Sequence, residues 1–282
     1  MLKIDVVRSV AALRAATRPH RQQGQRIGLV PTMGALHQGH LELVKAARRH
    51  ADFVVATIFV NPLQFNPSED LDAYPRDEAT DLNLLAATGA DLVFAPNVAE
   101  MYPKNFSTEV KVGALTKYLD GPARPGHFEG VATVVTKLFN QAQPDIACFG
   151  EKDFQQLQVI KRLTRDLDLP IEILPVPTVR DEDGLAMSSR NRYLSEKERI
   201  AASMLPASLH DAVKELQAGD PAAPILEKTR AVLKSAGFGP IDYVELCDAE
   251  TLQPLPAARE GSRLFAAAHL GRTRLIDNWP VL

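Results

Sequence analysis

Apolar and polar positions along the first part of the chain follow two alternating patterns. Short apolar runs rich in Val, Ile and Phe predict strands at residues 27–30, 53–60, 91–95, 146–149 and 171–176. Most of these runs are followed by a segment with helical periodicity. The clearest lies at residues 128–141, where Val131, Val134, Val135, Leu138 and Phe139 form one apolar stripe. This alternation predicts an α/β fold with a Rossmann-like parallel sheet flanked by helices.

The ends of further elements are marked by residues that suit helix termini. A helix is expected after residue 40, with Leu41, Val44 and Ala47 on its apolar face. Another is expected to begin near Pro75 and to stop before Gly89. In open parallel sheets, ligands bind beyond the carboxyl ends of the strands. The loops that follow strands, at residues 31–40, 61–74, 150–156 and 177–192, are therefore expected to converge on one crevice.

The pattern changes after residue 179. A charged loop at residues 180–184 precedes Ser195 and Glu198, which have the spacing of a capping box that opens a long helix. Three short strands are then predicted at residues 242–246, 263–268 and 273–277, the last two joined by a turn at residues 271–272. We therefore expect two domains: a Rossmann-like domain at 1–178, and a smaller C-terminal α+β domain at 179–282 with a short antiparallel sheet.

Composition narrows the class of protein. The chain has 282 residues, of which 45% are hydrophobic and 24% charged, which is ordinary for a globular protein. A net charge of -3 argues against nucleic-acid binding through a broad basic face. The start of the chain lacks the apolar core of a secretion signal, and no apolar run is long enough to span a bilayer. We expect a cytoplasmic protein with no membrane partner, whose two cysteines, Cys148 and Cys247, are reduced and buried.

Candidate chemistry starts in residues 31–40, PTMGALHQGH, between a predicted strand and a predicted helix. Backbone N–H groups and the helix dipole favour an anion there, and Gly34 and Gly39 let the backbone approach a ligand closely. Imidazoles of His37 and His40 can donate hydrogen bonds to phosphate oxygens, where charge grows during attack on phosphorus. Helix capping, a surface position and a metal site are the alternatives. Zinc is disfavoured because no third ligand is evident nearby.

Three further polar clusters follow predicted strands. Residues 61–67, NPLQFNP, offer amides that donate and accept, which suits a substrate with hydroxyl groups, although a plain Asx turn is favoured at residues 66–67. Residues 150–156, GEKDFQQ, offer N–H groups and a lysine for phosphate, or a solvated helix start. Residues 187–191, MSSRN, place two hydroxyls and an arginine where they can neutralise a departing pyrophosphate and close the site.

Six segments in order, PTMGALHQGH, FVNPLQFNP, YPRD, RPGHFEGV, CFGEKDFQQ and MSSRNRYL, resemble the pantoate-β-alanine ligase (pantothenate synthetase) family over nearly the whole chain. This family belongs to the nucleotidyltransferases with a HIGH motif, which residues 37–40 match, and residues 187–190 match its KMSKS-like loop. The resemblance implies ATP-dependent condensation of (R)-pantoate with β-alanine through pantoyl adenylate, releasing pyrophosphate and AMP, in the biosynthesis of pantothenate and coenzyme A. It further implies magnesium with ATP, and a homodimer formed through the first domain.

The resemblance also implies residue roles. His40 is the principal catalytic residue, and His37, Lys152 and Arg190 are the other catalytic residues. Gln64 binds pantoate and borders the β-alanine site, and Gln156 binds pantoate as well. The residues expected to hold ATP are Met33, Gly34, Ala35, Leu36, His37, Gln38, Gly39, His40, Gly150, Glu151, Lys152, Asp153, Val179, Met187, Ser188, Ser189 and Arg190.

Four residues are weaker candidates for the triphosphate or for loop closure: Asn61, Tyr74, Arg124 and His127. As alternatives, His127 caps the helix it precedes, Tyr74 packs on Pro75 and Arg124 is solvated. No direct magnesium ligand is assigned. The first domain is expected to bind ATP and pantoate, and the second to act as a lid that excludes water from the acyl adenylate.

Two other functions compete with the ligase. An adenylyl- or cytidylyltransferase releases pyrophosphate and stops at a nucleotide-linked product without releasing AMP. Gln64 and Gln156, suited to a hydroxy acid, argue against it. A regulatory module that binds nucleotide without turnover is the second alternative, and the intact set of His37, His40, Lys152 and Arg190 argues against that.

Overall fold

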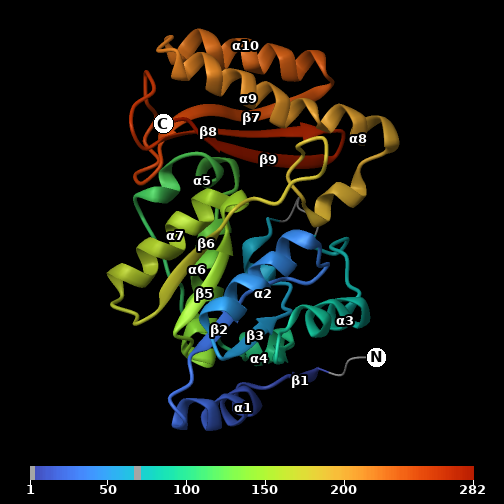
Figure 1. Ribbon diagram of the computed structural model, residues 1–282, viewed down its shortest axis with the longest axis vertical. Helices are drawn as coiled ribbons and strands as arrows, with labels where there is room; N and C mark the ends of the chain where they lie inside the picture. Colours follow the sequence, from blue (N-terminus) through green and yellow to red (C-terminus); the bar gives the residue numbers. More distant parts are fainter. Residues whose placement is uncertain (1–3, 67–70) are drawn as a thin grey trace. The chain divides into compact units, whose positions relative to one another are not determined.

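The computed structural model describes residues 4–66 and 71–282. The chain divides into two compact units (Figure 1). Unit 1 consists of Met1–Gly113, Arg124–Glu151 and Gln156–Pro177, and unit 2 of Ala114–Ala123, Lys152–Gln155 and Thr178–Leu282. Two short segments, 114–123 and 152–155, therefore belong to the unit that holds the C-terminal part of the chain.

Unit 1 is built on a six-stranded parallel sheet of order β1-β4-β3-β2-β5-β6. Every residue of β2 and β4 is buried, as expected for inner strands covered on both faces. The predicted fold class and the five predicted strands are confirmed. The additional strand β1 has three residues at the sheet edge, too short for a readable pattern. The strands are β1 (Asp5–Val7), β2 (Ile27–Val30), β3 (Phe53–Thr57), β4 (Leu92–Phe94), β5 (Ile146–Gly150) and β6 (Glu172–Val176).

Helices flank this sheet. Helix α2 packs on β2, β3 and β5 and contacts α3, whereas α1 packs against α6 (Figure 1). The connection from β2 to β3 runs in the opposite direction along the sheet from that between β4 and β5. Right-handed crossovers therefore place α2 and α6 on opposite faces. The helices that begin in or run through unit 1 are α1 (Val10–Gln22), α2 (Gln38–His50), α3 (Glu78–Thr88), α4 (Val98–Met101), α6 (His127–Ala142) and α7 (Phe154–Asp166), with a 3-10 turn η1 (Pro62–Gln64).

The strand order reverses between β2 and β5. From β2 the chain continues to β3 on one side, and from β5 it continues to β6 on the other. The two strands pair in parallel, with Gly28 opposite Ile146, so their carboxyl ends lie next to each other. Doubly wound sheets bind ligands at such a point. The loop of residues 31–37 begins at the carboxyl end of β2, and Gly150 is the last residue of β5.

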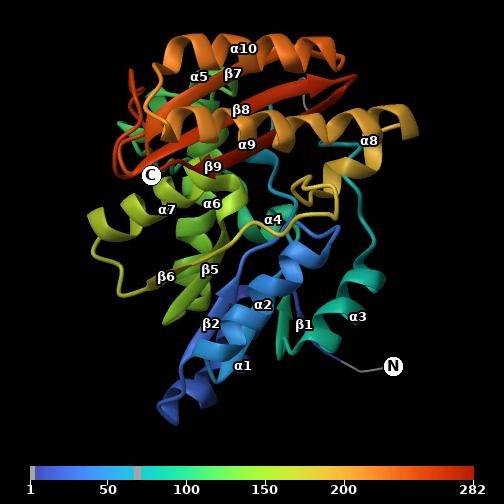
Figure 2. The ribbon, with the colours of Figure 1, turned by 45° about the horizontal axis from the view of Figure 1, so that its top comes forward.

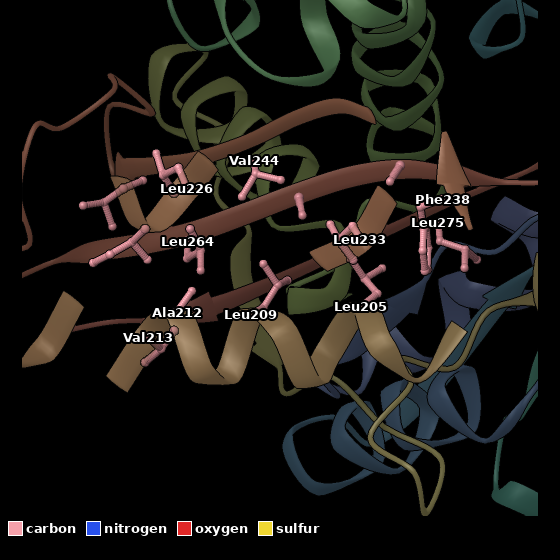
Figure 3. Packing of buried hydrophobic residues seen from close by; sticks show 14 of the residues in the cluster. Leu205, Leu209, Ala212, Val213, Leu226, Leu233, Phe238, Val244, Leu264 and Leu275 are labelled. Carbon is pink, nitrogen blue, oxygen red and sulfur yellow. The ribbon is translucent and has the colours of Figure 1, made fainter. Parts of the chain in front are cut away.

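Unit 2 holds an antiparallel sheet of order β7-β8-β9, with a tight connection at residues 271–272 as predicted. Helices α9 and α10 lie along one face of this sheet (Figure 2). Between these helices and the sheet is a separate core, which includes Leu205 and Leu209 of α9, Leu233 of α10 and Leu264 of β8 (Figure 3). The elements of unit 2 are η2 (Leu115–Lys117), α5 (Asp120–Ala123), η3 (Glu151–Asp153, at the boundary), η4 (Ser189–Tyr193), α8 (Glu196–Ala202), α9 (Met204–Gln217), α10 (Ala222–Ser235), β7 (Phe238–Asp248), β8 (Ser262–Leu270) and β9 (Thr273–Pro280).

Several predicted boundaries differ from the structure. The capping box of Ser195 and Glu198 is present, but the long helix it was expected to open is broken at Ser203 into α8 and α9. Pro206 explains the break, because it lacks the N–H that would bond to the carbonyl of Ala202. The strand at 53–60 ends at Thr57, and the helix expected near Pro75 begins at Glu78 after the cap Asp77.

Candidate active site

The loop between β2 and α2 is held by its own buried polar groups. The hydroxyl of Thr32 donates to the carbonyl of Thr57 at 2.5 Å, and the N–H of Gly34 donates to that hydroxyl at 3.2 Å. Thr32 N–H in turn donates to the Thr57 hydroxyl at 3.2 Å. The end of β3 therefore fixes the start of the loop.

Asp81, on α3, fixes the middle of the same loop. Its carboxylate is buried and accepts the N–H groups of Ala35 and Leu36, each at 2.8 Å. Gly34 and Ala35 both have positive φ, 81° and 52°, and the N–H groups of Ala35 and Leu36 that follow this turn of the backbone point to the Asp81 carboxylate. The anion bound here is the side chain of Asp81. A Cβ on Gly34 would lie 2.9 Å from the Asp81 oxygen, so glycine is required.

His37 and His40 cap α2, as one of the alternatives for this motif proposed. Nδ1 of His37 accepts the N–H of Gly39 at 3.1 Å, and Nδ1 of His40 accepts the N–H of His37 at 3.3 Å. A backbone N–H can only donate, so each neutral imidazole carries its proton on Nε2. The rings lie 4.1 Å apart between centroids. Capping thus leaves both imidazoles in the tautomer that can donate from Nε2, and the two roles are compatible. Gln38 is exposed beside them and donates to Glu42.

Asn61 connects three elements of unit 1. It is 1% exposed, and its Oδ1 accepts the hydroxyl of Tyr102 at 2.7 Å and the N–H of Leu63 at 3.3 Å. Its amide donates to the carbonyl of Gly130 at 3.1 Å and to Oε1 of Gln64 at 3.0 Å. Burial raises the pKa of Tyr102, which keeps its hydroxyl protonated as a donor. Asn61 therefore fixes η1 rather than presenting a free amide.

Gln64 joins two of the motifs in space. Its Nε2 donates to the sulfur of Met33 at 3.2 Å, which places the second polar cluster beside the loop after β2. Gln64 is half-buried, with Oε1 set by Asn61. No local sequence signal connects Met33 with Gln64. Their proximity follows from the general expectation that loops after parallel strands converge at the carboxyl edge of the sheet.

His127 and Arg124 bind the backbone of η1. His127 Nδ1 donates to the carbonyl of Gln64 at 2.9 Å, and its Nε2 accepts from Arg124 at 2.9 Å. His127 is the first residue of α6, and the cap position is Gly126, so the alternative in which His127 caps this helix is wrong. Arg124 also reaches the carbonyl of Gln64, at 3.5 Å. Both side chains act on the position of Gln64.

The remaining candidates of unit 1 lie on or next to these elements. Tyr74 is buried and meets Phe65 edge-on at 5.9 Å. Gln156 is half-buried in the first turn of α7. Gly150 ends β5, and Glu151 starts η3. The turn predicted at residues 66–67 includes Pro67, which lies outside the described residues.

Lys152 and Asp153 belong to unit 2. The carbonyl of Lys152 accepts the side-chain amide of Asn278 at 2.9 Å. The Lys152 ammonium lies 3.7 Å from the carboxylate of Asp153. Gln155, two residues further on, is buried and donates to the carbonyls of Leu115 and Tyr118. These bonds explain why residues 152–155 group with the C-terminal unit.

The last cluster starts from a small hairpin in unit 2. Met187 N–H donates to the carbonyl of Val179 at 2.9 Å, and Arg180 pairs with Ala186. Ser188 then caps η4, its hydroxyl accepting the N–H of Arg190 at 3.3 Å. Ser189 is buried, and Arg190 is half-buried. Val179 and residues 187–190 are thus held together as one piece.

Acidic residues are the natural protein ligands for magnesium. Within residues 4–66 and 71–282, no three His, Cys, Asp or Glu side chains are grouped as a metal site. Asp81, next to the loop after β2, is occupied by two backbone N–H groups. Mg²⁺ commonly binds through substrate phosphates, water and one or two carboxylates. Across the same described residues, no helix is both long and apolar enough to cross a membrane.

Two residues that hold the site in unit 1, Asp81 and Tyr102, are not among those predicted from the sequence. Asp81 shares a helix face with the buried Leu85, four residues later, and a carboxylate on an apolar face was the signal available. Tyr102 had no comparable signal, because its partner Asn61 is remote in sequence. Within unit 1 the structure brings Met33, Gln64, Arg124 and His127 together. Lys152, Val179 and Arg190 lie in unit 2.

Comparison with known proteins agrees over the whole chain. The family model described as pantoate-beta-alanine ligase matches residues 5–280. The pantothenate synthetase of Rhizorhabdus wittichii is 56% identical, with 99% of both chains covered, and that of Caulobacter vibrioides is 53% identical, with 98% of both covered.

Solved structures agree as well. A crystal structure of pantothenate synthetase from Thermus thermophilus has a TM-score of 0.93 at 48% identity and covers 99% of each chain. The pantoate-beta-alanine ligase of Francisella tularensis, complexed with beta-gamma ATP and beta-alanine, has a TM-score of 0.84 at 33% identity and covers 98% of this chain and 97% of its own. The resemblance carried by the six sequence motifs is thereby confirmed, and the chain belongs to the pantoate-β-alanine ligase family.

Proposed function

We propose that this protein condenses (R)-pantoate with β-alanine to form pantothenate, at the expense of ATP. In the first step, a carboxylate oxygen of pantoate attacks the α-phosphorus of ATP. The bond from that phosphorus to the bridging oxygen breaks, and pyrophosphate leaves with the electron pair. The product is pantoyl adenylate, a mixed anhydride in which AMP is a good leaving group.

The observation that carries this proposal is the protonation pattern of His37 and His40. Both Nδ1 atoms accept backbone N–H groups, so both Nε2 atoms bear the proton. Nε2 donors at a helix N-terminus match the oxygens of a triphosphate, on which charge rearranges as pyrophosphate departs. Lys152 and Arg190 supply positive charge to the same phosphates in this proposal.

In the second step, the neutral amine of β-alanine attacks the acyl carbon. The bond from this carbon to the phosphate oxygen breaks, AMP leaves, and the amine loses a proton to give the amide. Gln64 binds pantoate and borders the position of β-alanine, and Gln156 binds pantoate. Arg124 and His127 hold the carbonyl of Gln64 and therefore act as positioning residues.

Water must be kept from the anhydride between the two steps. We propose that domain 179–282 acts as a lid that excludes water during turnover. Magnesium, when bound with ATP, neutralises and orients the phosphates. The protein residues retain their own roles: His37 and His40 donate hydrogen bonds, and the lysine and arginine provide positive charge.

Product analysis tests this function. The protein is incubated with ATP, magnesium and pantoate, with and without β-alanine, and pyrophosphate, AMP and pantothenate are followed separately. We expect exchange of labelled pyrophosphate into ATP that requires pantoate alone, and steady AMP release only after β-alanine is added. Pyrophosphate release without AMP under all conditions would support a nucleotidyltransferase instead. Nucleotide binding without any turnover would support a regulatory module.

Assembly and location are part of the same proposal. We propose a homodimer formed through the first domain, in the cytoplasm, with no nucleic-acid partner. Sedimentation velocity of the purified protein tests the dimer, since a monomer at micromolar concentration would contradict it.

A further inference from the structure

Asn278 on β9 holds the segment that carries Lys152. Its amide donates to the carbonyl of Lys152 at 2.9 Å, and its own oxygen accepts the guanidinium of Arg263. Arg263 in turn stacks on the ring of Phe154, 3.9 Å from the centroid, and Phe265 meets the same ring. Phe265 is paired directly with Asn278 across β8 and β9. Side chains on one face of the antiparallel sheet thus contact residues 152–154 at two positions, Lys152 and Phe154.

The neighbouring residue, Asp277, holds the hairpin that leads to residues 187–190. Its carboxylate accepts two N–H groups of Arg180, at 2.7 and 2.9 Å, and also faces the indole N–H of Trp279. The guanidinium lies 4.1 Å from the centroid of the Trp279 ring. Arg180 donates again to the carbonyl of Gly184, within the hairpin. Val179 and Met187, bonded to each other, form the base of the same hairpin.

The geometry of a strand explains how adjacent residues reach two segments. Side chains at successive positions point to opposite faces, so Asp277 and Trp279 share one face while Asn278 lies on the other. Both residues are almost fully buried, Asp277 at 3% and Asn278 at 4% exposure. Buried polar groups of this kind are costly unless satisfied, and here the partners are the backbone and side chains of the two segments.

We propose that Asp277 and Asn278 are positioning residues for ATP, which together fix the spacing between Lys152 and residues 187–190 within unit 2. This inference rests on the proposed function for its catalytic consequence, but the positioning itself concerns unit 2 alone. Because Asp277 and Asn278 are adjacent on one hydrogen-bonded strand, the segment that carries Lys152 and the segment at residues 187–190 keep the same spacing within unit 2.

Asn278→Ala is the principal variant. It removes the donor to Lys152 and leaves the pair of Asp277 with Arg180 in place. The matched control is Leu275→Val on the same strand, which reduces packing in the core of unit 2 and leaves both Asp277 and Asn278 in place. Arg180→Lys is the second variant, because it keeps the positive charge beside Asp277 but loses the bidentate hydrogen bonding to the carboxylate.

Two measurements separate positioning from general loss of stability. The first is hydrogen exchange by mass spectrometry, in which we expect peptides covering residues 150–157 to exchange faster in Asn278→Ala than in Leu275→Val, while peptides from α10 stay alike. For Arg180→Lys, the change is expected in peptides covering residues 179–190. Equal exchange of these peptides in variant and control would overturn the positioning role, whatever the protein catalyses.

The second measurement is a double-mutant cycle on pantoate-dependent pyrophosphate release. Asn278→Ala alone is expected to lower kcat by about 10-fold, since small misplacement of a catalytic group has effects of this order. In a Lys152→Ala background, the same change should have little further effect, because the group it positions is gone. A full additional loss in that background would refute action through Lys152. If the unaltered protein releases no pyrophosphate, the proposed function fails, while hydrogen exchange still decides the positioning.

Discussion

At the scale of single residues, the site is held mainly by bonds between side chains and backbone. His37 and His40 each use Nδ1 for a backbone N–H, and Asp81 binds two more N–H groups of the same loop. Hydrogen bonds from backbone donors to an ionised acceptor are strong and directional. The loop after β2 therefore has a defined shape before any ligand binds.

His40→Ala separates the catalytic role from the cap. We expect pantoate-dependent pyrophosphate release to fall by about 10²-fold or more, as when a donor to developing charge is removed. Loss of one acceptor at the helix start should cost about 1 kcal/mol of unfolding free energy. The readouts are the release assay and urea unfolding. His50→Ala, at the exposed end of the same helix, is the control, and a folded His40→Ala protein with near-normal release would disprove the role.

Asp81→Asn tests the buried anion. Asparagine keeps the size but offers one acceptor oxygen, so one N–H of Ala35 or Leu36 loses its partner. We expect a loss of about 1–3 kcal/mol in unfolding free energy, together with a raised KM for ATP. Asp77→Asn on the same helix is the matched control, because asparagine caps helices as well as aspartate does. Equal KM values in the two variants would show that Asp81 does not shape the ATP loop.

At the scale of elements, the position of η1 depends on close approach to α6. A Cβ at Gly130 would lie 2.2 Å from the carbonyl of Leu63, and Asn61 and His127 form hydrogen bonds across the same contact.

In unit 2, the hairpin at residues 179–187 is held by Arg199 on α8. That guanidinium bonds to Asp183 at 2.5 Å and to Asp181 at 3.0 Å.

In Gly130→Ala, the higher helix propensity of alanine is opposed by the steric clash of its methyl group with η1. Alanine in a helix normally stabilises by up to about 1 kcal/mol relative to glycine. Here the methyl group must displace η1, and we expect a net loss of about 1–3 kcal/mol with a raised KM for pantoate. Thermal unfolding and steady-state kinetics measure both. Gly113→Ala, where nothing lies within 4 Å of the added Cβ, is the control. Stabilisation of Gly130→Ala would contradict the close contact.

Arg199→Gln should alter the dependence of stability on pH. The hydrogen bond from Arg199 holds the pKa of Asp183 below its usual range. A depressed pKa stabilises the fold above the unfolded-state value, about 3.9, and this contribution disappears as the pH falls through the folded value. Both side chains are about one-third exposed, 35% and 36%, so screening limits the effect to about 0.5–1 kcal/mol.

Urea unfolding of the unaltered protein and of Arg199→Gln should therefore differ most at pH 6, and the difference should shrink as the pH falls below about 3.9. Lys214→Gln, which removes an exposed pair with Asp211, is the control and should show a smaller difference at pH 6. A difference between the unaltered protein and Arg199→Gln that grows on acidification would contradict the sign of this linkage.

At the scale of the whole molecule, two units have separate cores and one thiol each. Cys148 lies in β5 of unit 1 and Cys247 in β7 of unit 2, and both are fully buried. Burial raises the pKa of each thiol to about 12. Neither cysteine is therefore a thiolate at neutral pH, in agreement with the expected reduced and buried state.

Alkylation by N-ethylmaleimide at pH 7.5 should report on the opening of each unit. We expect no modification of either cysteine in the native protein within minutes, and full modification of both in guanidinium chloride. At intermediate denaturant, the thiol of the less stable unit should react first, as read by peptide mass spectrometry. Rapid labelling of either thiol in native buffer would contradict its burial.

Most of the fold was predictable from sequence, and part of the site. The strand at 27–30, the stop at Gly89 and the turn at 271–272 follow from signals within a few residues. Of the site, the motifs gave the candidate residues, but the roles of His40, Lys152 and Arg190 in catalysis remain predictions. The capping box signals only where a helix starts, and the break at Ser203 was missed although Pro206, which explains it, is present in the sequence.

The chain by itself determined the local elements, the family and the position of each polar cluster after a strand, because periodicity and short motifs are local signals that span only a few residues. Only the tertiary structure decided that Asp81 binds the loop after β2, 45 residues away, and that Asn278 binds the carbonyl of Lys152, 126 residues away. Such pairs have no periodic signature. They exist because folding buries polar groups that must find partners wherever the packed chain provides them.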